Sequence, residues 1–205
     1  MIDLLRAGAF CVLVALCQAP AALGQDQPER YRILPEASLL QVHTYKGGLL
    51  GAFGHEHDIR AHGFSGTVIY QPLDAEASHV AVTVRTDSLF VVPASDSSDL
   101  PDITRAMREE VLHVDSFPQI TFTSTAVEFQ DSTVHVRGDL TIVGNTRPVE
   151  MDLVLHIAPP VLHVWGTFTV KQTDFGIRPY STALGTVKVK NEITFVLDIR
   201  AIPTF

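Results

Sequence analysis

Cysteine is scarce in this chain of 205 residues, and both cysteines, Cys11 and Cys17, lie close to the N-terminus. The remainder of the chain has no thiol, which excludes disulfides, thiolate metal ligands and a cysteine nucleophile from it. Its stability must therefore come from a hydrophobic core, and the 46% hydrophobic content is enough for one domain.

Positive charge is also in short supply. The chain has 15 lysines and arginines against 23 acidic residues, a formal net charge of -8, and no basic cluster along the sequence. An acidic chain of this kind argues against nucleic acid as a partner and against electrostatic docking on anionic lipid.

No apolar run is long enough to cross a membrane, which takes about 20 residues. The stretch AGAFCVLVALC follows Arg6 and precedes small residues, as in a secretory signal peptide. We expect residues 1–24 to be that signal, with cleavage before Gln25 and export to the periplasm or beyond the cell. A lipid anchor on Cys17 is the alternative, disfavoured by the bulky Leu16 before it. The mature chain is then expected to have no membrane span.

Apolar and polar residues alternate with a period of two over most of the chain. In SHVAVTV the valines 80, 82 and 84 share one face, and PVEMDLVLHIA and NEITFVLDIRA show the same pattern. Such alternation predicts strands with one buried and one wetter face. Turn signals such as QPLD and VGNTRP separate these segments.

One segment breaks the alternation. Residues 97–118 place Ile103, Met107 and Val111 at helical spacing after an N-cap candidate, Asp99 or Asp102. We predict one short helix there. Residues 25–205 are thus expected to form a single all-β antiparallel domain of about eight or nine short strands, either a closed barrel or a sandwich. A barrel of about eight strands can hold one elongated ligand.

Five segments, in order, resemble the YceI-like family of bacterial periplasmic proteins: YRILPEASLLQVHTYKG, GFSGTVIYQPLDAEASHVAVTV, LHVDSFPQITFTSTAVE, VRGDLTIVGNTRPVEMDL and KQTDFGI. The resemblance covers about residues 31–201. It implies a lipocalin-like barrel around a hydrophobic tunnel that holds a long isoprenoid chain or a quinone with an isoprenoid tail. The segment GHEHDIRAHGFSG departs from the family's commoner pattern and resembles a Gly-His-x-His subgroup, to which that ligand need not transfer.

If the tunnel exists, residues on the inward faces should line it. The predicted lining is Val82, Val84, Phe122, Ile142, Leu153, Leu155 and Phe195, with Trp165 lining or filling the interior. The alternative is that these side chains pack together and leave no cavity.

The segment GAFGHEHDIRAHGF contains His55, His57 and His62. On a strand, residues i and i+2 face the same way about 7 Å apart, so His55 and His57 could share zinc or another divalent metal. His62 or His113 could supply the third protein ligand that zinc requires. Alternatively, the three histidines orient a ligand's polar head near the barrel mouth, aided by an inward-turned Arg105, or they face solvent.

Catalysis has little support, because the Gly-x-Ser-x-Gly motif of a serine nucleophile is absent. The leading hypothesis is a non-enzymatic binding or carrier protein for an apolar isoprenoid lipid or isoprenoid quinone. A histidine-dependent metal-binding protein or metalloenzyme is the second hypothesis, and a ligand-free stress-response or interaction module is the third. A homodimer stays open.

Overall fold

The alternating segments form strands along most of the chain in the computed structural model, which describes residues 28–47, 56–93, 99–182 and 187–204. The strands are β1 (Glu29–Ile33), β2 (Leu39–Gly47), β3 (His57–Ala61), β4 (Phe64–Tyr70), β5 (His79–Arg85), β6 (Leu89–Val91), β7 (Gln119–Gln130), β8 (Thr133–Ile142), β9 (Asn145–Ala158), β10 (Val161–Lys171), β11 (Ser181–Thr182) and β12 (Val187–Pro203).

The sheet closes on itself. The neighbours run in the order β1-β4-β5-β7-β8-β9-β10-β12, and β12 pairs back with β1, with Tyr31 opposite Pro203. Every pairing is antiparallel, so the prediction of an antiparallel barrel of about eight strands with one short helix is confirmed. Strand β1 pairs with the last residues of β12, and β2 pairs with β12 over most of its remaining length. Strand β3 then pairs with β2, and β6 pairs with β3.

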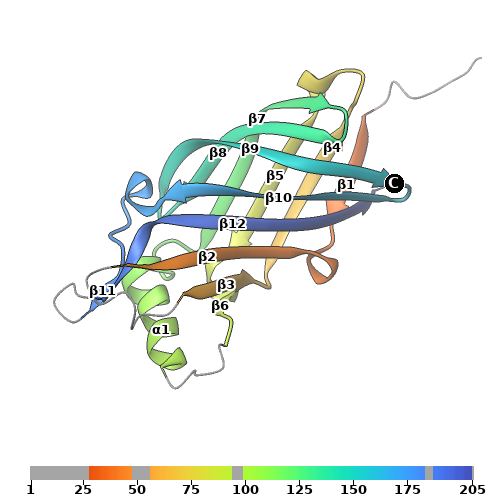
Figure 1. Cartoon of the computed structure of the whole chain (residues 1–205). Helices are drawn as coiled ribbons and strands as arrows, with labels where there is room; N and C mark the ends of the chain where they lie inside the picture. The colour runs from red at the N-terminus through yellow and green to blue at the C-terminus, as the bar shows by residue number, and fades with distance from the viewer. Residues whose placement is uncertain (1–27, 48–55, 94–98, 183–186, 205) are drawn as a thin grey trace, which may run out of the picture.

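The barrel has two distinct ends (Figure 1). At the helix end, β2 finishes at Gly47, β3 begins at His57 and the helix α1 lies across the strand tips. At the opposite end, which we call the terminal end, β1 begins at Glu29 and β12 finishes at Pro203. Candidate sites can therefore be assigned to one end or the other.

Helix α1 (Leu100–Ala106) starts after Asp99 and continues as a π-helical turn to Val111. Its Met107 is buried in the cluster that includes Leu89 and Val91 of β6, so the helix is fastened to the barrel by apolar contact. The helix predicted within residues 97–118 is present, and the next strand begins after Pro118 as expected. Within the described ranges, no helix has the length and apolar character needed to cross a membrane.

The barrel interior is densely filled toward the helix end. Buried side chains there come from the ends of β8, β9 and β10, from the turn after β10 and from the start of β12: Ile142, Val149, Val170, Phe175, Ile177 and Ile193. Gly176, in the left-handed conformation at φ 72°, ends the turn that inserts Phe175. These residues at the helix end are buried and do not line the cavity.

An apolar cavity as the candidate functional site

The barrel interior encloses a cavity that extends from Tyr70 and Ser78 at the terminal end to Val84 and Ile120 near the helix end. It leaves about 160 Å³ for the centres of water-sized molecules, within an empty volume of about 1140 Å³ that includes space open to solvent. Its walls are almost wholly aliphatic and aromatic: Ile33, Leu40, Val68, Ile69, Tyr70, Ser78, Val80, Val82, Val84, Ile120, Thr121, Phe122, Val127, Phe129, Val134, Val136, Leu140, Met151, Leu153, Leu155, Leu162, Val164, Phe168, Phe195, Leu197 and Ile199. None of these residues belongs to α1.

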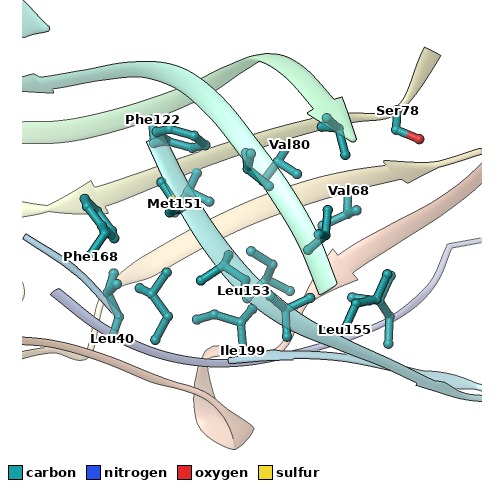
Figure 2. A pocket seen from close by; sticks show the side chains of 18 of the residues that line it. Leu40, Val68, Ser78, Val80, Phe122, Met151, Leu153, Leu155, Phe168 and Ile199 are labelled. Atoms are coloured by element: carbon teal, nitrogen blue, oxygen red, sulfur yellow. The ribbon is translucent and has the colours of Figure 1, made fainter. Parts of the chain in front are cut away.

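Strand register explains why the lining is so uniformly apolar. Directly opposed residues of antiparallel strands point to the same face, and Val82 faces Phe122, which in turn faces Leu140. Figure 2 shows side chains from different strands, Val68 and Leu155 among them, converging on the space between them. Because each strand alternates, its polar residues point outward to water.

A glycine in the wall fixes the position of one aromatic ring. A Cβ added at Gly138 would lie 2.5 Å from the Phe122 Cζ atom and 2.6 Å from the Thr123 carbonyl oxygen. The Phe122 ring therefore occupies the place that a side chain at position 138 would take. Phe168 and Phe195 stack beside each other with centroids 4.7 Å apart, and together these rings form the aromatic part of the wall.

Polar side chains border the cavity at its terminal end. Ser78 is buried, and its hydroxyl is used locally: it accepts from the Gln71 amide at 2.9 Å. Tyr70 packs its ring edge-on against Phe129, with centroids 5.4 Å apart. Burial, followed by the nearby Glu29 carboxylate, raises the pKa of Tyr70 above its ordinary value. The Tyr70 side chain therefore stays a neutral phenol.

Tyr31 lies beside this group and is almost fully buried. Its hydroxyl donates a hydrogen bond to the Glu29 carboxylate. Burial is the main cause that raises the pKa of Tyr31 to about 12, with the hydrogen bond and charge of Glu29 adding to it. The carboxylate is thus held by one tyrosine and faces a second across the strand pair, where Glu29 is opposite Tyr70.

Six of the residues predicted to line a tunnel lie along the cavity: Val82, Val84, Phe122, Leu153, Leu155 and Phe195. Ile142 is buried but belongs to the filled helix end. Trp165 lies on the outer surface, 36% exposed, with its ring tilted against His163. It alternates with the inward Val164, and this parity places it outside the barrel.

The predicted head-binding residues lie away from this cavity wherever the structure describes them. His57 begins β3 at the helix end, and its backbone N–H donates to the Thr44 hydroxyl. His62 is exposed and meets Phe90 edge-on at 4.2 Å. Arg105 points to solvent and pairs with Asp102 at 2.9 Å, so the picture of an inward-turned arginine does not hold. His55 lies outside the described residues.

The part of the chain that the structure describes contains no group of three histidine, cysteine or acidic side chains arranged to hold a metal. Near β3, it is His43 that meets carboxylates, with Nδ1 2.7 Å from Asp58 and Nε2 3.7 Å from Glu56. Because His55 is not described, shared metal binding by His55 and His57 stays a prediction.

The sequence reasoning did not single out Tyr70, Phe129 or Glu29. The segment FSGTVIY alternates from Phe64 to Tyr70, so period-two analysis would have placed Tyr70 on the inward face with Val68. Glu29 had no such signal, because it lies in the polar stretch QDQPER, which shows no alternation of apolar residues.

The fold and the cavity together define a class: an antiparallel eight-stranded barrel with an apolar interior, which fits a ligand-binding protein. The family model described as the YceI-like domain matches residues 31–201, and the chain belongs to this family. The resemblance inferred from the sequence is thereby confirmed.

Individual relatives give the same family. The chain is 34% identical over 92 residues to "Protein YceI" of Salmonella arizonae and to that of Salmonella newport, a match that spans 45% of this chain and 45% of each relative. Among solved structures, Burkholderia cenocepacia BcnA superposes with a TM-score of 0.66 at 18% identity, covering 82% of this chain and 98% of that one. A Campylobacter jejuni YCEI protein gives 0.58 at 14% identity, covering 72% and 85%. At these identities the structural likeness concerns the fold.

Proposed function

We propose that the protein is a non-enzymatic carrier that holds one long apolar chain, an isoprenoid lipid or the tail of an isoprenoid quinone, in its barrel. The observation that supports this most is the cavity wall. Across the 26 lining residues the only polar side chains are Ser78, Thr121 and the phenol of Tyr70. A wall of this composition offers few hydrogen-bonding groups to a polar solute, whereas it can shield hydrocarbon from water.

The energetics favour a long chain over a short one. Each methylene removed from water contributes about 0.8 kcal/mol to the free energy of binding. The cost in lost translational and rotational freedom is incurred only once per ligand, whatever its length. Affinity should therefore grow with chain length until the cavity is full. Much of the lining consists of valine and leucine side chains, which contact a hydrocarbon ligand without requiring hydrogen bonds from it.

Export fits this role. The predicted signal at residues 1–24 would deliver the chain to the periplasm or outside the cell, where an apolar lipid needs a carrier to cross water. The signal segment lies outside the described residues, so mass spectrometry of the mature N-terminus is its test. A start at Gln25 is the expected result.

The test of binding is uptake of an isoprenoid alcohol or isoprenoid quinone, followed by native mass spectrometry and by titration. Val68→Trp should block the cavity, because Val68 lies on its wall. Val196→Trp makes the same change on β12 at a half-buried position that does not line the cavity, and is the matched control.

We expect the wild type and the Val196→Trp variant to take up one ligand each, and the Val68→Trp variant to lose at least tenfold in affinity while unfolding at a similar temperature. Equal uptake by all three would contradict binding in the cavity, and no uptake by the wild type would contradict the proposal itself.

A further inference from the structure

The side chains at the end of an apolar cavity contact the polar head group of the ligand and so determine which head group binds. At the terminal end Tyr70 on β4 lines the cavity, and Glu29 on β1 lies opposite it, exposed to water at the rim. The two residues are directly opposed in the antiparallel pair, so both project from the same face of the sheet. That face is the inner one, because Tyr31 and Ile33 on the same parity of β1 are buried in the interior.

The hydroxyl of Tyr70 has no hydrogen-bond partner among the described residues, although its ring lines the cavity. The other two polar residues of the wall offer less. The Ser78 hydroxyl accepts from the Gln71 amide and is committed to that turn. Thr121 alternates with the inward Ile120 and Phe122, so its hydroxyl lies toward the outer face. Tyr70 is thus the hydroxyl available to a ligand.

Glu29 adds a fixed negative charge at the same place. Its carboxylate already accepts a hydrogen bond from Tyr31, which holds it on the inner side of β1. The arginines of β1, Arg30 and Arg32, alternate with Tyr31 and point to the outer face. They cannot neutralise an anion inside the mouth as directly as Glu29 repels it.

The loops around the terminal end add further negative charges. Loops at the terminal end carry Asp74, Glu76 and Asp131. The four lysines of the chain lie in strand segments at the helix end: Lys46, Lys171, Lys188 and Lys190. Three arginines also lie at the terminal end, Arg30 and Arg32 on β1 and Arg200 on β12, where Arg200 pairs with Asp198 at 2.7 Å. The loop carboxylates add to the repulsion of an anion by Glu29.

We infer that Tyr70 and Glu29 form the polar terminus of the cavity and select a ligand with an uncharged hydrogen-bonding head, such as a hydroxyl, over a ligand with an anionic head. Tyr70 and the Glu29 carboxylate can both engage a hydroxyl, which donates and accepts. A carboxylate or phosphate head placed next to Tyr70 would instead come close to the exposed Glu29 carboxylate, and like charges repel each other. This inference rests on the proposed function, and it places the head at the end of the barrel opposite His57.

The experiment compares two probes with the same chain, geranylgeraniol and geranylgeranoic acid, by titration at pH 7 against the full mature protein. The wild type should prefer the alcohol by about fivefold or more, the size of the repulsion between two like charges about 4 Å apart in water. Glu29→Gln should narrow that preference by strengthening binding of the acid. Tyr70→Phe should weaken binding of the alcohol about three- to tenfold, the size of one hydrogen bond.

Two control variants separate these effects from general ones. Glu36→Gln removes a carboxylate away from the mouth, in the turn after β1, and Tyr180→Phe removes the hydroxyl of an exposed tyrosine. Both should keep the wild-type preference. Equal affinity for the two probes, or a preference unchanged in Glu29→Gln, would overturn the inference while leaving the carrier role standing. Failure of the wild type to bind either probe would overturn both.

Discussion

At the scale of single residues, Tyr31 near the mouth of the cavity and Gly138 in its wall occupy tightly packed positions. Tyr31 is almost fully buried with its hydroxyl on Glu29, and Gly138 leaves the space that the Phe122 ring fills. We expect both residues to contribute to stability whether or not a ligand is bound. Their variants therefore test the structure independently of function.

The raised pKa of Tyr31 predicts a loss of stability in alkali. Tyr31 has an ordinary pKa of 10.0 and a folded value of about 12, so between these values the folded chain keeps a proton that the unfolded chain has lost. The contribution is fully present below pH 10 and disappears as the pH rises through 12. Thermal melts of Tyr31→Phe should fall less steeply over this window than those of the wild type.

Tyr180→Phe provides the control, because Tyr180 is 38% exposed and its loss should leave the wild-type slope. Parallel melting curves for the wild type and Tyr31→Phe would show that Tyr31 ionises as readily in the folded chain as in the unfolded one.

Gly138→Ala should destabilise the barrel by about 1–3 kcal/mol, the usual range for overpacking. The new methyl group would meet the Phe122 ring and the Thr123 backbone, and the backbone cannot move aside cheaply. Gly47→Ala is the comparison: its nearest neighbour is the Lys190 Cγ at 3.2 Å, on a flexible side chain. Urea unfolding should show little change for Gly47→Ala; equal losses in the two variants would contradict the packing described around Phe122.

At the scale of elements, helix α1 and the π-helical turn that follows it cover the helix end of the barrel. Met107 supplies the buried contact, and Arg108 donates to the Asp87 backbone carbonyl beside it. The helical spacing of Ile103, Met107 and Val111 was visible in the sequence, and so was the Pro118 boundary. The π-helical turn was not visible, because it depends on how the chain fits over β6.

Met107→Ala should cost about 2–5 kcal/mol of unfolding free energy, since it empties a buried site. Arg105→Ala should change stability by no more than about 0.5 kcal/mol, because the Arg105–Asp102 pair is exposed to water. Guanidinium unfolding of both variants is the measurement. A small loss for Met107→Ala would mean that the helix is not held on the barrel by this contact.

At the scale of the whole molecule, period-two alternation predicted the strands and which residues face inward, and the family resemblance selected a barrel with a tunnel. Val82, Phe122 and Leu153 followed directly from their parity. Parity could not decide between hollow and filled, because Ile142 has the same inward direction as the lining residues yet lies in packed core. That difference depends on which side chains meet across the barrel, and strand pairing alone does not give it.

The position of the polar mouth was also beyond the sequence. Histidines close together in the chain drew attention to residues 55–62, whereas Glu29 and Tyr70 are separated by 41 positions and meet only through the β1–β4 register. Trp165 was expected inside because aromatic residues of strands are usually core. Its parity on β10 instead leaves it outside, tilted against His163.

The central claim is that the apolar cavity of the barrel holds one long apolar molecule. The most direct measurement is native mass spectrometry of the protein purified, without detergent, from the bacterium that makes it. The account predicts one adduct per chain, whose mass on release corresponds to an isoprenoid lipid or isoprenoid quinone, and its absence from Val68→Trp prepared in the same way. A clean unliganded mass for the wild type, with no uptake when isoprenoid alcohol or quinone is added, would contradict it.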